Sequence, residues 1–179
     1  SQKTIAASTT IDGGNLVTLD GGNATRLFLT NYQVPFTVRN ITLQNARTTD
    51  VGGAIRAGYQ APLTVTDSRF YNNTCTQAGP DVGGGAIYVQ GGDTLIQRVT
   101  FSGNRGGNGG AMGNLQSRTT IEDSVFLNNQ TNAAGTGGGA GGAGGGAAGL
   151  AALEGRGVAI PGARTTAALA LRMRCPGAV

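Results

Sequence analysis

A segment of about ten residues recurs four times along this chain of 179 residues, and this repetition constrains the fold more than any other feature. The copies are FTVRNITLQN from Phe36, LTVTDSRFYNN from Leu63, TLIQRVTFSGN from Thr94 and TTIEDSVFLNN from Thr119. Each copy is followed by Gly-Gly-Ala, at residues 52–54, 84–86, 109–111 and 138–140. Repeats of this length with variable insertions indicate a solenoid, in which each repeat packs on its neighbours.

Apolar residues alternate with polar ones inside each copy, and this period of two predicts β-strands rather than helices. Equivalent apolar positions form one column of Val38, Val65, Ile96 and Ile121, and a second of Leu43, Phe70, Phe101 and Phe126. The second column has spacings of 27, 31 and 25 residues, which fit one coil of a parallel β-helix. The sequence therefore predicts an all-β protein, a right-handed parallel β-helix of about five coils, with the three phenylalanines stacked and buried.

Polar residues at fixed positions predict the corners of the coils. The bend inside each copy holds Asn40, Asp67, Arg98 or Asp123, and Asn and Asp tolerate the left-handed backbone conformation expected there. Three copies end in Phe-x-x-Asn, at Asn73, Asn104 and Asn129, whose stacked amides are expected to hydrogen-bond between coils. Gly-Gly before Ala suits a corner with positive φ.

Composition excludes several functional classes. The chain has no His, which removes Ser-His-Asp triads and His-ligated zinc sites. The two cysteines, Cys75 and Cys175, lie 100 positions apart, so they form no CxxC metal site; whether they pair is left open. Arginines are scattered singly beside one lysine, which argues against nucleic-acid binding. The longest uncharged run, Ser124 to Leu153, is too rich in Gly for a membrane helix. We expect no resident metal or cofactor and no membrane-spanning segment.

The repeat stops near residue 140, which predicts a β-helix over residues 1–140 and a Gly/Ala-rich tail over 141–179. Residues 132–179 hold 14 Gly and 14 Ala, and a single Asn, Asn132. Three interpretations are open: a flexible linker with a terminal anchor or cap, a degenerate last coil formed by Gly157 to Leu171, or a GC-rich gene read in a shifted frame.

Together, TIDGG from Thr10, NITLQNA from Asn40, GGAI and Phe-x-x-Asn resemble a known group. They are similar to bacterial right-handed β-helix proteins with polymorphic outer-membrane-protein type repeats, within the pectate-lyase-like superfamily. The resemblance covers residues 4 to about 140. It implies a secreted or surface-displayed protein, but the superfamily contains lyases, hydrolases, adhesin passenger domains and proteins without known activity, so the fold alone does not give the function.

Two groups of residues are candidates for a site. Asp67, Arg98 and Asp123 are expected to stack at one corner; the superfamily's polysaccharide lyases use an Arg base near acidic calcium ligands, so these are the catalytic candidates, with calcium as the cofactor, if the protein is an enzyme. We favour the alternative, a surface ion-pair ladder without chemistry. Tyr71 and Tyr88 are the carbohydrate-binding candidates, because exposed tyrosines stack on sugar rings. Tyr32 and Tyr59 are expected to face outward with them.

The function that we expect is structural or adhesive, at an extracellular or cell-surface location. The first coil begins within about ten residues of Ser1, so the N-terminal end of the solenoid is expected to be bare and to contact another copy, as an end-to-end oligomer or fibre. The expected partners are therefore a second copy or surface glycans. The alternative is a polysaccharide lyase acting on acidic glycans.

Overall fold

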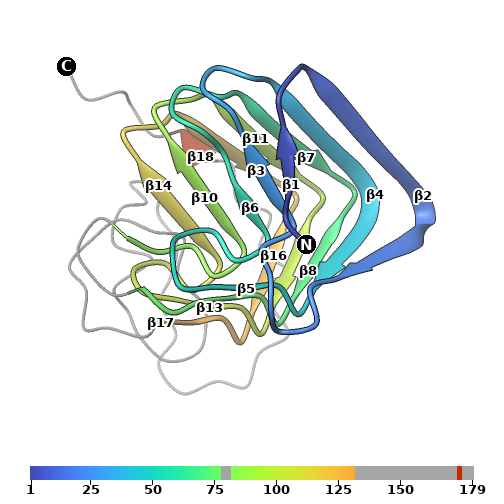
Figure 1. Cartoon of the computed structure of the whole chain (residues 1–179), viewed down its shortest axis with the longest axis vertical. Coiled ribbons are helices and arrows are strands. Elements are labelled where there is room, and N and C mark those ends of the chain that lie inside the picture. Colours follow the sequence, from blue (N-terminus) through green and yellow to red (C-terminus); the bar gives the residue numbers. More distant parts are fainter. Residues whose placement is uncertain (78–81, 132–172, 175–179) are drawn as a thin grey trace.

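The computed structural model describes residues 1–77, 82–131 and 173–174, which form strands, turns and loops without a helix (Figure 1). Parallel strands from successive coils lie side by side in three sheets, named A, B and C in the order in which the chain visits them. Five strands in sheet A correspond to five coils. The predicted parallel β-helix is confirmed. No helix long and apolar enough to cross a membrane occurs among these residues.

The strands are assigned to the sheets as follows. Sheet A contains β1 (Lys3–Ile5), β3 (Phe28–Thr30), β6 (Ile55–Arg56), β10 (Ile87–Gln90) and β14 (Met112–Leu115). Sheet B contains β2 (Thr9–Asp20), β4 (Phe36–Gln44), β7 (Leu63–Thr66), β8 (Arg69–Tyr71), β11 (Thr94–Gln97), β12 (Thr100–Ser102), β15 (Thr119–Glu122), β16 (Val125–Leu127) and β18 (Met173–Arg174). Sheet C contains β5 (Arg47–Thr48), β9 (Thr74–Cys75), β13 (Arg105–Gly106) and β17 (Gln130–Thr131).

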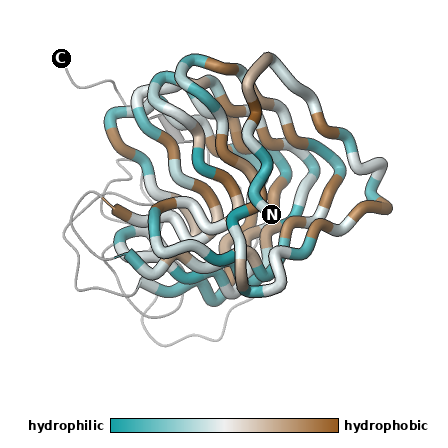
Figure 2. The backbone as a smooth tube through the Cα atoms, in the orientation of Figure 1, coloured by the Kyte–Doolittle hydropathy of each residue, from teal (hydrophilic) through white to brown (hydrophobic). Residues whose placement is uncertain are grey.

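The two predicted apolar columns run through sheet B in strict register. Val38 pairs with Val65, and the pairing continues to Ile96 and Ile121. The aromatic column continues in the same way from Leu43 to Phe126. Matching hydrophobic segments therefore recur on successive coils, where the side chains meet in the core (Figure 2).

The phenylalanines stack as predicted. The ring centroids of Phe70 and Phe101 are 5.0 Å apart, and those of Phe101 and Phe126 are 4.8 Å apart, with nearly parallel planes. Phe70 and Phe101 are completely buried, whereas Phe126 is only partly buried. The expected full burial of Phe126 is wrong because β16 is the last strand on that side of sheet B.

Glycines make the corner before sheet A. The first glycine of each described Gly-Gly-Ala has a positive φ, as predicted, at Gly52 (65°), Gly84 (69°) and Gly109 (87°). The second glycine is needed for close approach between coils, since a Cβ on Gly53 would overlap the carbonyl oxygen of Gly85. The alanine that follows is buried in the core.

The bend in sheet B has the left-handed conformation expected from the sequence. Its φ angles are 54° at Asn40, 51° at Asp67, 53° at Arg98 and 47° at Asp123. Arg98 thus adopts the same backbone as the other three, although arginine rarely does so. The position in the coil, rather than the residue type, decides the backbone here.

A buried asparagine ladder holds the corner between sheets B and C. The Nδ2 of Asn73 donates to the Oδ1 of Asn104 at 3.0 Å, and the Nδ2 of Asn104 donates to the Oδ1 of Asn129 at 2.8 Å. Each Nδ2 also donates to a backbone carbonyl in the preceding coil, at 3.0 Å. The predicted ladder is confirmed, and it satisfies polar groups that burial would otherwise leave unpaired.

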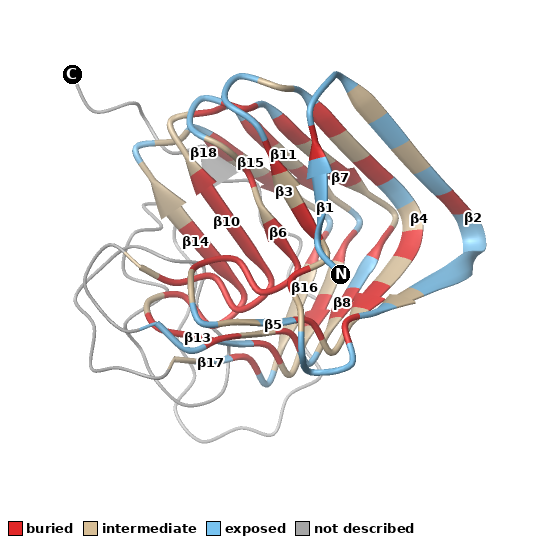
Figure 3. Ribbon diagram, viewed as in Figure 1, coloured by how far each residue is buried: buried red, intermediate tan, exposed pale blue. Residues whose placement is uncertain are grey.

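The two ends of sheet B differ. At the N-terminal end, β2 pairs with β4, and most of its residues are exposed (Figure 3). At the other end, β18 pairs antiparallel with β15, through Thr120 opposite Arg174 and Ile121 opposite Met173. The fourth Gly-Gly-Ala, the possible coil of Gly157 to Leu171, and Cys175 lie outside the described residues, as does the proposed boundary at residue 140.

Candidate functional site

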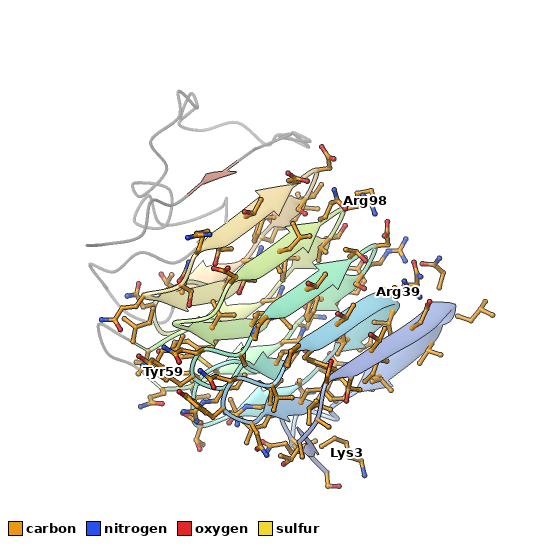
Figure 4. The ribbon with its side chains drawn as sticks, turned by 90° about the horizontal axis from the view of Figure 1, so that it is seen from above. Lys3, Arg39, Tyr59 and Arg98 are labelled. Atoms are coloured by element: carbon orange, nitrogen blue, oxygen red, sulfur yellow. The ribbon has the colours of Figure 1, made fainter. Side chains whose placement is uncertain are left out.

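The bend in sheet B brings Asp67 and Arg98 together on successive coils. Arg98 Nε donates to Asp67 Oδ1 at 2.6 Å, and Arg98 Nη2 donates to Asp67 Oδ2 at 2.7 Å. This two-bond geometry is the strongest form of an arginine–carboxylate pair. Both side chains are on the surface, and Figure 4 shows Arg98 on the same side of the solenoid as Arg39.

Asp123 occupies the equivalent position on the next coil, but the structure shows no ion pair between it and Arg98. Its charge acts on Arg98 only as a secondary influence, after the hydrogen bond that Arg98 donates to Asp67. Within the described residues, the expected three-member ladder is therefore a bidentate pair with a neighbouring carboxylate.

Electrostatics at this pair disfavour base chemistry. The hydrogen bond from Arg98 lowers the pKa of Asp67, and the same bond raises the pKa of Arg98 above its ordinary value. A lyase base must accept a proton, which requires a guanidinium that has lost one. Because Asp67 stabilises the charged guanidinium, this contact makes Arg98 a poorer base.

The geometry of the candidate residues also bears on calcium binding. Calcium is held by six to eight oxygen ligands, commonly from several carboxylates. Over the described ranges, no group of three His, Cys, Asp or Glu side chains is arranged to hold a metal ion. Asp67 also uses both of its oxygens for Arg98. The residues at this bend do not fit a calcium site.

The first coil contains two acidic corners that the sequence analysis did not select. Asp12 Oδ1 accepts from the backbone N–H of Gly14 at 2.9 Å and from Asn40 Nδ2 at 3.0 Å, while its other oxygen accepts from Arg39 Nε at 2.8 Å. These bonds, that from Asn40 first, lower the pKa of Asp12.

Asp20 repeats the arrangement at the next corner. It accepts from Gly22 N–H at 2.7 Å and from Gln44 and Asn45 at 2.8 Å. The sequence signal was the repeated Asp-Gly-Gly, at residues 12–14 and 20–22. Both aspartates connect the first coil to the second, because each accepts hydrogen bonds from side chains of the second coil.

A second missed cluster surrounds the buried side chain of Arg26. Arg26 Nη2 lies 2.8 Å from Asp50 Oδ2, and Arg56 Nη1 lies 2.6 Å from the same oxygen. Arg26 also donates to the carbonyl oxygens of Val51 and Gly52. Counting back two residues from the pairing of Phe28 with Ile55, Arg26 aligns with Gly53 of the third coil. An arginine at a glycine position was the signal that could have identified it.

The two arginines of this cluster share one carboxylate, that of Asp50. Burial raises the pKa of Asp50, but hydrogen bonds from Val51 N–H and Arg26 and the charge of Arg56 outweigh it, so the pKa is lowered overall. Nearby Cys75 is buried, and burial raises the pKa of its thiol. Its thiol is therefore protonated and unsuited to nucleophilic chemistry.

The tyrosines separate into three environments. Tyr71, on β8, is half-buried. Tyr88 is only 6% exposed, so its selection as an outward carbohydrate-binding residue is wrong. Its ring lies against Gly113, where a Cβ would be 2.9 Å from Tyr88 Cδ2, and its own Cβ lies close to Gly52. Gly-rich segments of neighbouring coils therefore allow the backbone to cover this ring.

Tyr32 and Tyr59 are the exposed tyrosines, at 60% and 47%. Their ring centroids are 6.1 Å apart and their planes differ by 15°. Figure 4 places Tyr59 on the side of the ribbon opposite Arg39 and Arg98. We call this pair the tyrosine platform.

Parallel coils, inward apolar columns and an asparagine ladder define a β-helix repeat protein. Residues 7–148 match the family described as the right handed beta helix region, and the chain belongs to that family. Comparison with curated proteins and with solved structures finds no match.

Proposed function

We propose that this chain is a secreted or surface-displayed structural or adhesive module, and that two copies associate through the exposed N-terminal ends of their solenoids. On the basis of the sequence motifs, the proposal also relates the repeats of this chain to those of the polymorphic outer-membrane-protein type. The observation that carries it is the exposed apolar surface on β2, at the end of the solenoid.

Large hydrophobic residues are exposed at two places in the described structure, the tyrosine platform and β2. On β2, Leu16 is 92% exposed and Val17 is 43% exposed. Ile11 and Leu19, on the same strand, are only partly covered by the core. An edge strand with apolar side chains is a template for pairing with another chain, because its backbone groups and side chains both gain partners.

The opposite end favours a pair of copies over an open fibre. There, β18 already pairs with β15 of the same chain, which supports the interpretation of the tail as a cap. If one end is covered, contact between two N-terminal ends uses the same surface on each copy and closes as a dimer.

Charged groups support a structural role over an enzymatic one. Arg98, Arg39 and Arg26 each pair with an aspartate on a neighbouring coil. Pairs of this kind connect neighbouring coils, and the aspartate offsets the charge of its arginine. The pairing of Arg98 with Asp67 argues against Arg98 as the base that the lyase alternative requires.

Sedimentation velocity over a concentration series tests the association. The parent chain is expected to form a dimer as concentration rises, and the double variant Leu16→Lys/Val17→Lys is expected to remain monomeric, because charge on an edge strand opposes pairing. Gln116→Lys is the control for an added surface lysine, with one new charge against the two of the double variant, in an exposed turn of the fifth coil.

A parent chain that stays monomeric at the highest attainable concentration would contradict the proposed association. Equal loss of dimer in the Gln116→Lys control would place the contact elsewhere. Cleavage of polygalacturonate or another uronate polymer by the parent, lost in Arg98→Ala, would replace the structural proposal with the lyase.

A further inference from the structure

We propose that the tyrosine platform binds a neutral, β-1,4-linked glycan by stacking one sugar ring on the open face of Tyr32. The inference deepens the adhesive part of the proposed function and rests on it. The platform lies in the turn between sheets A and B, at residues 31–35 of the second coil and 57–62 of the third.

Repeated sequence makes the two tyrosines equivalent. Tyr-Gln-x-Pro occurs at residues 32–35 and again at 59–62. Gln33 and Gln60 both have positive φ, at 55° and 57°, and Gln33 N–H donates to the carbonyl oxygen of Tyr59 at 3.0 Å. The turn therefore presents both rings from the same backbone position on adjacent coils.

The ring of Tyr59 has neighbours on two adjacent coils. Tyr32 stacks on one face, and a Cβ on Gly91, in the next coil, would lie 3.0 Å from Tyr59 Cε2. The Tyr32 hydroxyl donates to Gln60 Oε1 at 3.1 Å, which fixes the first ring relative to the second. Rings that are ordered in advance lose little conformational freedom when a ligand binds.

The first coil leaves the remaining face of Tyr32 uncovered. The strands of that coil remain in register, with Ile5 opposite Thr30 and Thr9 opposite Phe36. However, the turn between them has only the three small exposed residues 6–8, against five residues at 31–35. The Tyr32 ring therefore projects past the first coil, in agreement with its greater exposure.

The chemistry around the rings selects the ligand. A β-1,4-linked glucopyranose with equatorial substituents presents axial C–H groups on both faces, which suit an aromatic face, and hydroxyls around its rim. Gln33 Nε2 donates to Gln60 Oε1 at 3.0 Å. The other ends of these exposed amides, Gln33 Oε1 and Gln60 Nε2, are positioned to accept from and donate to sugar hydroxyls.

The charge of the surface favours neutral over acidic sugars. Residues 31–38 and 57–66 contain no charged side chain, and neither do residues 6–8. A uronate would therefore meet no cation in the turns of the first three coils, although the equivalent turns of the fourth and fifth coils contain the paired residues Asp93 and Arg118. The same stretches offer an aromatic surface and amides, which suit glucose or N-acetylglucosamine units.

The test titrates the full chain with cellohexaose and with chitohexaose. Because the chain has four Tyr and no Trp, tyrosine fluorescence reports the contact directly, and calorimetry gives the affinity. Tyr32→Ala is expected to weaken binding about tenfold or more, which is ~1.4 kcal/mol. Tyr59→Phe keeps the ring and should retain binding. Gln130→Ala, which changes an exposed residue on sheet C, is the control and should also bind normally.

Circular dichroism and sedimentation of the same variants separate the outcomes. Tyr32→Ala should keep the parent fold and the parent association, because its side chain is exposed and its turn adjoins Thr9 at the start of β2, whereas Leu16 and Val17 lie beyond the register shift of that strand. Three results would contradict glycan binding by the tyrosine platform: no binding to either oligosaccharide, equal binding by Tyr32→Ala, or a preference for polygalacturonate. Association that persists without glycan binding would overturn this inference alone.

Discussion

Replacing Phe101 by Ala is the most direct test of the stacked core. Phe101 is fully buried, and its ring is sandwiched between Phe70 at 5.0 Å and Phe126 at 4.8 Å. Removing it deletes both ring contacts and leaves a cavity. The coils on either side are fixed by parallel backbone hydrogen bonds, so they cannot move together to fill it.

We expect the free energy of unfolding to fall by ~3–5 kcal/mol, the usual cost of Phe→Ala in a core that cannot collapse. For a domain of this size, the melting temperature should fall by about 6–20 °C. Urea unfolding followed by circular dichroism gives the free energy directly. The slope with urea should remain unchanged, because the loss concerns packing in the native state.

Phe126→Ala is the matched control. It removes the same atoms from the last strand on that side of sheet B, where the ring is only partly buried. Its cost should be about half that of Phe101→Ala, because burial and cavity are both smaller. Equal costs for the two variants, or less than ~1 kcal/mol for Phe101→Ala, would refute the reasoning.

Three further predictions concern polar groups. Asn104→Ala should lower the free energy of unfolding by ~3 kcal/mol or more, since buried partners in two coils lose hydrogen bonds; exposed Gln130→Ala should change it by less than ~0.5 kcal/mol in the same urea assay. Asp50 has a pKa below its ordinary 3.8, so its contribution is complete above that pH and is lost as pH falls through the lowered value; Asp50→Asn should show a shallower loss of stability on acid titration than the parent. Arg98→Ala should change thermal stability only slightly, with the difference shrinking at high salt, and a large, salt-independent loss would contradict a surface pair.

The coil architecture could be predicted from the sequence because the same alternating segment occurs four times. Every coil repeats the alternation around Val65 or Ile96, and a parallel register places equivalent residues in contact automatically. The same logic predicted the asparagine ladder and the positive φ at the bend. A position such as Arg98 adopted the bend conformation without a favourable residue type, since its neighbours above and below fix its backbone.

Other features depended on how turns of different lengths pack against each other on adjacent coils. Tyr88 was expected to face outward with the other tyrosines, but glycines of adjacent coils let the backbone cover its ring. Asp50 contacts Arg26, which is 24 positions away, and Arg56, which is 6 positions away, and all three residues lie outside the repeated segment. The open face of Tyr32 arises because the preceding turn is shorter. Local pattern determines which residues form columns, whereas burial and pairing outside the columns depend on loop lengths and side-chain reach, which only the tertiary structure decides.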